Sequence, residues 1–303
     1  MVTATQASRR AALWMLISTF AFGLMAITIR LASSNLATTE IAFFRNAFGL
    51  LTLLLLIVRP GKPLPRTRQL PQYLARTSIG LASMLCGFWA IGHLPLSQAI
   101  SLSYSTPLFV TVLAVVWLHE QVRMRRWLAV AAGFIGVLVI LRPGSSTFAP
   151  GLLIALLGAV ISAVVAIQIK QLSRSDDSNT VVFYTYAFWV PMSLIPALFQ
   201  WTWPHGIDWL WLVATGVFGT AGQLFWTRAL KLGEVSALQP ISFIQLLLVA
   251  LLGWWLFGEE IACHTMIGAA IIIGANVYIA HRESVLARRA ATHAPVGGAK
   301  PGE

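Results

Sequence analysis

Residues 11–31 read AALWMLISTFAFGLMAITIRL, with a single charged residue, Arg30, next to the end. A transmembrane α-helix needs about 20 consecutive and mostly apolar residues, and this run has that length. It is too long for the apolar core of a signal peptide, and further runs like it follow. The stretch therefore predicts a helix that crosses a membrane.

Nine more apolar runs of similar length follow along the chain. The runs are continuous and lack the alternation of polar and apolar residues that barrel strands show. The sequence therefore predicts an all-α, polytopic membrane protein of ten transmembrane helices. The ten predicted spans lie at about residues 11–31, 37–58, 71–93, 97–118, 125–142, 150–172, 180–200, 207–230, 236–257 and 262–281.

The overall composition points to lipid as the solvent. The chain of 303 residues is 57% hydrophobic and 10% charged, whereas about 25% of the residues of a soluble protein are charged. The two cysteines, Cys86 and Cys263, give neither a disulfide framework nor metal-ligand spacing, and no cofactor is expected. The sequence has no P-loop, His-Glu-x-x-His or Gly-x-Ser-x-Gly motif, which argues against P-loop ATP hydrolysis and against an intramembrane enzyme.

The positive charge is distributed unevenly between the two ends of the predicted helices. If the N-terminus lies inside, 18 of the 21 Lys and Arg residues fall in inner segments, Arg76 among them. Only Arg30, Arg45 and Arg142 then fall outside. This is the positive-inside pattern, which explains the formal charge of +11 without a nucleic-acid partner. We predict a bacterial inner-membrane protein with both termini in the cytoplasm and an even number of spans.

The sequence repeats itself in two halves. Segments 26–30 and 43–48 match segments 166–170 and 183–188 at an offset of 140. The repeat unit contains five spans, so the second copy enters the membrane from the opposite side. Such an inverted repeat is typical of secondary transporters. The predicted organisation is an N-terminal tail (1–10), two five-helix repeats (11–145 and 146–282) and a C-terminal tail (283–303).

These features together resemble a known family. Phe43-Phe44-Arg45 stands in the second predicted span, and Leu94-Pro95-Leu96 leads into a serine-rich fourth span with Pro107. Glu120 and Glu259 stand at the ends of spans. Over about residues 11–282 the pattern is similar to the EamA-type carriers of the drug/metabolite transporter superfamily, and among them to YddG-type aromatic-amino-acid exporters. The resemblance implies a central solute cavity lined by spans 1, 3, 4, 6, 8 and 9, with spans 2 and 7 more peripheral.

Polar and aromatic side chains at helical spacing mark candidate solute contacts. Polar side chains within spans tend to face the bundle interior or a wet cavity, and residues three or four apart share a helix face. Deep tryptophans are suited to stacking on a flat solute. The alternative is helix–helix hydrogen bonding for the polar residues and core packing for the tryptophans. The candidate substrate-binding residues are Trp89, Gln98, Ser101, Tyr104, Ser105, Gln223, Trp226, Gln239, Ser242 and Gln245.

Two prolines and three ionisable residues complete the candidates. Pro107 and Pro240 interrupt the fourth and ninth spans and free the carbonyls one turn earlier, at Ser103 and Ser236. Those carbonyls are expected to bind solute or to act as hinges, unless the prolines are static kinks. The ionisable candidates for a charge or proton role are Glu40, Arg45 and His93, each with a structural alternative.

The function predicted from these features is a secondary transporter or facilitator of small organic solutes. Aromatic or large neutral amino acids are favoured, exported by alternating access. The site is expected to be neutral and partly aromatic, because no carboxylate occupies the centre of a predicted span. Carriers of nucleobases, cofactors or lipophilic drugs fit the same residues, and a channel-like pore is the alternative from another class. The expected partners are the solute and the lipid bilayer, with the chain a monomer or a homodimer.

Overall fold

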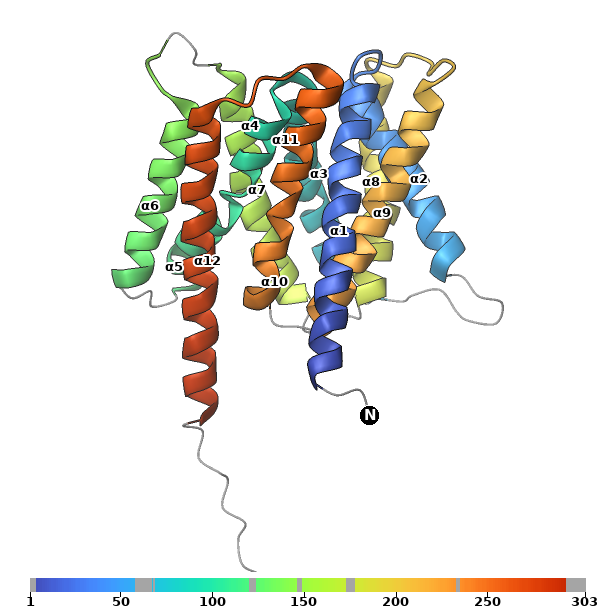
Figure 1. Cartoon of the computed structure of the whole chain (residues 1–303). Helices are drawn as coiled ribbons and strands as arrows, with labels where there is room; N and C mark the ends of the chain where they lie inside the picture. Colours follow the sequence, from blue (N-terminus) through green and yellow to red (C-terminus); the bar gives the residue numbers. More distant parts are fainter. Residues whose placement is uncertain are drawn as a thin grey trace, which may run out of the picture.

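The computed structural model describes residues 4–57, 67, 69–119, 124–145, 149–172, 178–232 and 235–292. These residues form α-helices joined by short loops and contain no strand (Figure 1). The helices are α1 (Ala4–Ala32), α2 (Thr38–Ile57), α3 (Leu70–His93), α4 (Leu96–Ser103), α5 (Thr106–Leu118), α6 (Met124–Leu141), α7 (Gly151–Leu172), α8 (Ser178–Leu198), α9 (Asp208–Leu232), α10 (Val235–Ser242), α11 (Ile244–Phe257) and α12 (Cys263–Thr292).

Eight helical segments of the described chain are long and apolar enough to cross a membrane. Two of these segments, Leu96–Trp117 and Pro240–Phe257, each contain a break, because they run from α4 into α5 and from α10 into α11. The helices α2 and α9 are not among the eight, although they have 20 and 25 residues. The predicted all-helical membrane fold is confirmed, whereas the count of ten spans stays a prediction.

The first break lies between α4 and α5, and it is satisfied within the chain. Pro107 is the second residue of α5, in the first turn, where no intrahelical partner is needed for its nitrogen. The hydroxyl of Thr106 donates to the carbonyl oxygen of Ser103 at 2.8 Å. A neighbouring side chain thus caps the carbonyl that proline leaves without its helical partner, and its predicted role in binding solute or as a hinge stays a prediction.

The second break follows Pro240, near the end of α10, and it contacts the first break directly. The hydroxyl of Tyr104 donates to the carbonyl oxygen of Ser242 at 2.7 Å. The rings of Tyr104 and Phe243 meet edge to face with centroids 4.9 Å apart. The two interrupted helices therefore touch where each changes direction. The carbonyl of Ser236 was also predicted to be free. Ser236 is not among the residues whose side chains the structure describes.

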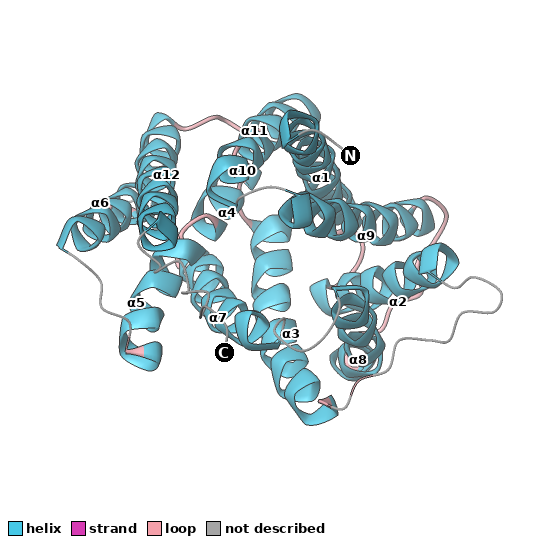
Figure 2. Ribbon diagram, turned by 90° about the horizontal axis from the view of Figure 1, so that it is seen from below, coloured by secondary structure: helices cyan, strands magenta, loops and turns pink. Residues whose placement is uncertain are grey.

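The remaining helices pack in pairs around these breaks. The helix α1 runs along α9, α3 along α7, α2 against α8, and α6 against α12. Figure 2 shows α6 and α12 together at one edge of the bundle. The start of α1 and the end of α12 project from the same end of the molecule, which is the lower end in Figure 1.

Glycines bring α9 close to its neighbours. A Cβ atom on Gly216 would lie 2.5 Å from Cβ of Phe48 and 3.0 Å from the backbone nitrogen of Gly49. Gly222 is similarly close to the ring of Phe22. Small residues let helix backbones approach within a membrane, where packing rather than hydrophobic burial drives association.

We predict that Gly216→Ala destabilises the bundle, because its Cβ would meet α2 atoms that cannot rotate away. Overpacking of this kind costs about 1–3 kcal/mol. The measurement is the melting temperature of the purified protein in detergent. Gly87→Ala is the control, since a Cβ on Gly87 meets nothing within 4 Å. Equal melting temperatures for the two variants would contradict the close approach of α2 and α9.

Candidate functional site

A cavity of about 290 Å³ lies among α3, α7, α8 and α9. Arg76, Thr77 and Ser83 of α3 line it, so it lies toward the lower end of the bundle, where α3 begins. Trp189 of α8 and Trp226 of α9 add two indole rings to the wall. The remaining polar lining comes from Ser162 of α7 and Gln223 of α9. The cavity therefore combines aromatic surface with hydrogen-bonding groups and one cation.

Hydrogen bonds between helices fix part of this wall. The hydroxyl of Ser83 donates to the carbonyl oxygen of Gly158 at 3.0 Å and lies 2.5 Å from the hydroxyl of Ser162. The indole nitrogen of Trp189 donates to the carbonyl oxygen of Thr77 at 2.9 Å. These bonds hold the indole of Trp189 and the α3–α7 seam in place. Trp226 is 38% exposed and so presents much of its surface to the cavity and beyond.

Arg76 is the functional candidate that the sequence reasoning missed. We counted it with the inner segments, but the structure places it inside α3 with its side chain only 8% exposed. It lies six residues from the start of the helix, which is about 9 Å at 1.5 Å per residue. The signal that identifies Arg76 is the same as for Arg45: a charged residue inside a membrane-spanning helix often marks a functional site.

The predicted substrate-binding residues divide into those at the cavity and those elsewhere. Gln223 and Trp226 line the cavity. Trp89, the repeat partner of Trp226, lies nearer the upper end of α3, where it stacks on the ring of His93 at 4.5 Å. A Cβ on Gly151 would lie 2.7 Å from the Trp89 ring. Trp89 therefore packs against the start of α7 and is not part of this cavity.

The polar residues of the fourth span mostly bond to nearby backbone. Ser101 donates to the carbonyl oxygen of Ser97 at 2.6 Å, and Ser105 donates to that of Leu102 at 2.6 Å. Gln98 and Gln245 are half-buried, and neither lines the cavity. Tyr104 and Ser242 join the two breaks as described above. The side chain of Gln239 lies outside the described residues.

The helices that form the cavity also differ from the set that the family resemblance implied. The third, sixth and eighth spans contribute, as α3, α7 and α9, in agreement with that expectation. The seventh span, expected to be peripheral, contributes Trp189 from α8, because its indole reaches the backbone of α3. The first, fourth and ninth spans contribute no residue to this cavity.

Glu40 is held in place by hydrogen bonds from the start of α2 and from a loop. Its carboxylate is fully buried and accepts hydrogen bonds from the backbone nitrogens of Ala37, at 3.0 Å, and Thr202, at 2.5 Å. It also accepts from the hydroxyl of Thr202. The carboxylate thus caps the start of α2 and ties it to the loop before α9. His93, the other proton candidate, is exposed and lies outside the cavity.

Arg45 is buried against aromatic rings. Its guanidinium carbon lies 5.1 Å from the ring centre of Tyr186 and 5.6 Å from that of Trp189. One nitrogen donates to the side chain of Asn46 at 3.0 Å. No ion pair with Glu40 forms, because five residues along one helix place the two side chains on different faces and Glu40 caps the helix start.

An ion pair connects the two halves at the upper end. Arg30 donates to the carbonyl oxygen of Gly92 at 2.6 Å and lies 3.2 Å from a carboxylate oxygen of Glu259. The other carboxylate oxygen of Glu259 accepts from the backbone nitrogen of Leu96 at 2.7 Å. These contacts tie the ends of α1, α3 and α11 to the start of α4.

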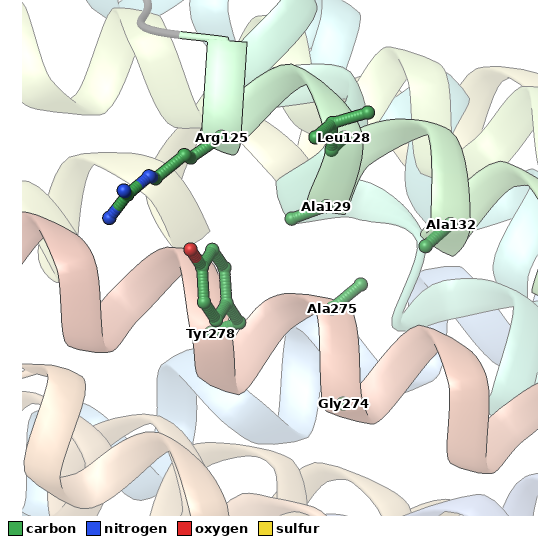
Figure 3. A pocket seen from close by; sticks show the side chains of 7 residues that line it. All are labelled: Arg125, Leu128, Ala129, Ala132, Gly274, Ala275 and Tyr278. Carbon is green, nitrogen blue, oxygen red and sulfur yellow. The ribbon is translucent and has the colours of Figure 1, made fainter.

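A second cavity, of about 500 Å³, lies between α6 and α12 (Figure 3). Figure 3 shows Arg125 of α6 and Tyr278 of α12 at one end of the lining, with Ala129 and Ala132 of α6 facing Ala275 of α12. The two helices stand at the edge of the bundle, and Leu128 and Tyr278 are 63% and 41% exposed. None of the predicted site residues lines this cavity, so we do not consider it the solute site.

The helical bundle and its polar, aromatic cavity are typical of a multi-pass membrane transporter of small solutes. The sequence profile of the EamA-like transporter family matches residues 9–142 and, a second time, residues 149–280. The chain belongs to this family. The family and the names of the relatives agree that its members are transporters.

Three relatives cover most of the chain. It is 31% identical over 283 residues to a riboflavin transporter of Vibrio cholerae, covering 92% of this chain and 95% of that protein. It is 32% identical over 262 residues to the pseudopaline exporter CntI of Pseudomonas aeruginosa, covering 85% and 90%. It is 27% identical over 270 residues to an S-adenosylmethionine uptake transporter of Rickettsia felis, covering 89% and 92%. A solved crystal structure aligns over 95% of this chain and 98% of that one, with a TM-score of 0.62 and 22% identity, and it shares the fold.

We predict that Glu259→Ala lowers the melting temperature in detergent, because the Leu96 N–H and the Arg30 guanidinium would both lose a partner. Leaving a buried donor unsatisfied costs about 1–3 kcal/mol. Glu260→Ala is the matched control, since Glu260 is the exposed neighbour with the same chemistry. If both variants melt together, the Arg30–Glu259 contact contributes nothing to the bundle.

Proposed function

We propose that this chain carries a small solute with a flat ring across the bacterial inner membrane, through the cavity among α3, α7, α8 and α9. The observation that supports this proposal is the pair of indoles at the cavity, Trp189 and Trp226, beside hydroxyl and amide groups. Aromatic surface binds flat rings and a few placed polar groups orient them. The volume of about 290 Å³ is close to the lower end of the range found for small-molecule sites.

The solute class follows from the cavity and from the relatives. Riboflavin and S-adenosylmethionine, which give two relatives their names, both contain a flat heteroaromatic ring. Aromatic amino acids, the substrates favoured by the sequence, contain a ring and a carboxylate and suit the same walls. We therefore propose ring-bearing metabolites as the class, with cofactors and aromatic amino acids as its two candidate members. Similarity to YddG-type exporters stays a prediction.

The proposed mechanism is alternating access by two inverted five-helix halves. The family profile matches twice, with starts at residues 9 and 149, which is a shift of 140, the offset of the sequence repeat. The packing supports a two-fold relation between the halves, since exchanging them converts the pair α1–α9 into α7–α3 and leaves α2–α8 and α6–α12 paired. The Arg30–Glu259 pair then closes the outer end while the cavity lies toward the inner end.

Movement down the solute gradient is the mode of transport that the cavity favours. Among the described residues that line it, none is a carboxylate or a histidine. Glu40, the buried acid that was a proton candidate, already accepts three hydrogen bonds at 3.0 Å or less. A carboxylate held in this way is a helix cap rather than a proton relay.

The proposed topology places the lower end of Figure 1, with both termini, in the cytoplasm. A green fluorescent protein fused after residue 303 should then be fluorescent in cells. As the control, alkaline phosphatase fused after Ser145, in the loop between α6 and α7, should be active because that loop lies outside. A dark C-terminal fusion in well-expressed protein would contradict the even number of spans.

We predict that Trp226→Ala raises the KM for the transported ring solute about tenfold, because stacking of a ring on an aromatic side chain is worth about 1–3 kcal/mol. The measurement is counterflow of labelled riboflavin, S-adenosylmethionine and aromatic amino acids into proteoliposomes. Trp255→Ala is the control, since Trp255 is 70% exposed on α11 and should leave KM unchanged. A KM in Trp226→Ala equal to that of the wild type would show that this cavity is not on the transport pathway.

The same assay separates a carrier from a channel, because only a carrier gives saturable counterflow.

A further inference from the structure

Arg76 carries a charge that the described protein does not neutralise. The one ion pair among the described side chains is Arg30–Glu259, far along the bundle at its upper end. Arg76 donates one hydrogen bond, from Nη1 to the hydroxyl of Thr185 at 2.7 Å. That hydroxyl donates in turn to the carbonyl oxygen of Val181. A neutral hydroxyl satisfies one N–H but does not compensate a buried positive charge.

The other donors of the Arg76 guanidinium are left without a partner beside the cavity. Its Nε is buried and has no hydrogen-bond partner among the described residues. Neither does Nη2 bond to any of them, and Arg76 lines the cavity. The Nε and Nη2 donors of arginine point in parallel and match the two oxygens of a carboxylate or phosphate. A guanidinium edge without a partner beside a cavity is suited to binding such an anion.

Arg45 of α2 adds positive potential against the same face of α8. It is 7% exposed, its Nε also lacks a partner among the described residues, and it contacts Trp189 and Tyr186 through their ring faces. Arg45 does not line the cavity. Arg45 therefore lies over the Trp189 ring, and Arg76 lines the same cavity as Trp189. The side chains that Ser162 of α7 and Gln223 of α9 add to the lining are polar but uncharged.

We propose that Arg76 binds an anionic group of the transported solute, a carboxylate or a phosphate, through its Nε–Nη2 edge. Trp189 and Trp226 contact the flat part of the same solute. This proposal rests on the proposed function and narrows its substrate class to ring-bearing anions and zwitterions. It also corrects the expectation of a neutral site, because a buried guanidinium favours solutes that bring the missing negative charge.

The experiment compares solutes that differ only in the anionic group. Full-length protein in proteoliposomes carries out counterflow while each competitor is titrated. Phenylalanine is compared with phenethylamine for the carboxylate, and flavin mononucleotide with riboflavin for the phosphate. In the wild type, the anionic member of at least one pair should compete at least tenfold better. The pair that shows the preference identifies the group.

Three variants assign the preference to its residue. Arg76→Gln removes the charge and should abolish the preference, whereas Arg76→Lys keeps the charge without the fork and should retain part of it. Arg45→Gln removes the other buried charge. In this variant the anionic solute should still compete better than its partner by the wild-type ratio, even if the total transport activity falls. An Arg76→Gln protein that keeps the full preference would overturn the proposal. An Arg45→Gln protein that loses the preference would also overturn the proposal, since the preference would then come from the summed positive potential of both arginines.

A binding measurement keeps the test decisive if no ring solute is transported or if a variant folds poorly. The melting temperature of purified wild type and Arg76→Gln is then followed with benzoate, benzamide and inorganic phosphate. A ligand that binds only the native state raises the melting temperature. Stabilisation by benzoate or phosphate in wild type alone supports the anion site even where the transport proposal fails. Equal shifts in both proteins, or none in either, reject it.

Discussion

The hydrogen bond from the hydroxyl of Tyr104 to the carbonyl oxygen of Ser242 joins the two places where a membrane-crossing helix is interrupted. Within hydrocarbon, a backbone group without a partner costs several kcal/mol, so a helix can break only where the protein supplies the missing bonds. Here Thr106 caps Ser103, the side chain of Asn276 donates to the carbonyl oxygen of Tyr104, and Tyr104 reaches across to Ser242. The breaks therefore depend on each other, and the packing of the two halves depends on both.

The two halves share a frame but not a charge distribution. At the offset of 140, Arg45 falls on Thr185, and at the offset of 137 that pairs Trp89 with Trp226, Arg76 falls on Val213. Both buried arginines thus belong to the first half, and both contact α8 of the second half. One copy of the repeated pattern supplies a cation where the other supplies an uncharged residue, so the cavity is electrostatically asymmetric although the helices are paired symmetrically.

The membrane-spanning helices could largely be predicted from the sequence, because the length of an apolar run and the charge of a loop are local properties. The positions of the breaks near Pro107 and Pro240 and the packing of the α9 glycines were also predictable from residue type. The cavity was only partly predictable. Helical spacing placed Ser101 and Ser105 on one face, but it does not show that each hydroxyl bonds to its own helix. Trp189 was missed because its place in the wall depends on a bond to Thr77, 112 residues away. Arg76 was missed because a charge near a helix end looks like a loop residue until the neighbouring helices are known.

The two indoles at the cavity give the protein a built-in optical signal. Tryptophan emission shifts and dims when a ring system with overlapping absorption stacks within a few ångströms of it. Trp189 and Trp226 line the cavity, whereas Trp201, Trp203 and Trp209 lie with aromatic neighbours near the loop between α8 and α9. Under the proposed function, solute binding would change the emission of the first group and leave that of the second group as it is. Binding at the proposed cavity could then be followed by spectroscopy, without a label on either molecule.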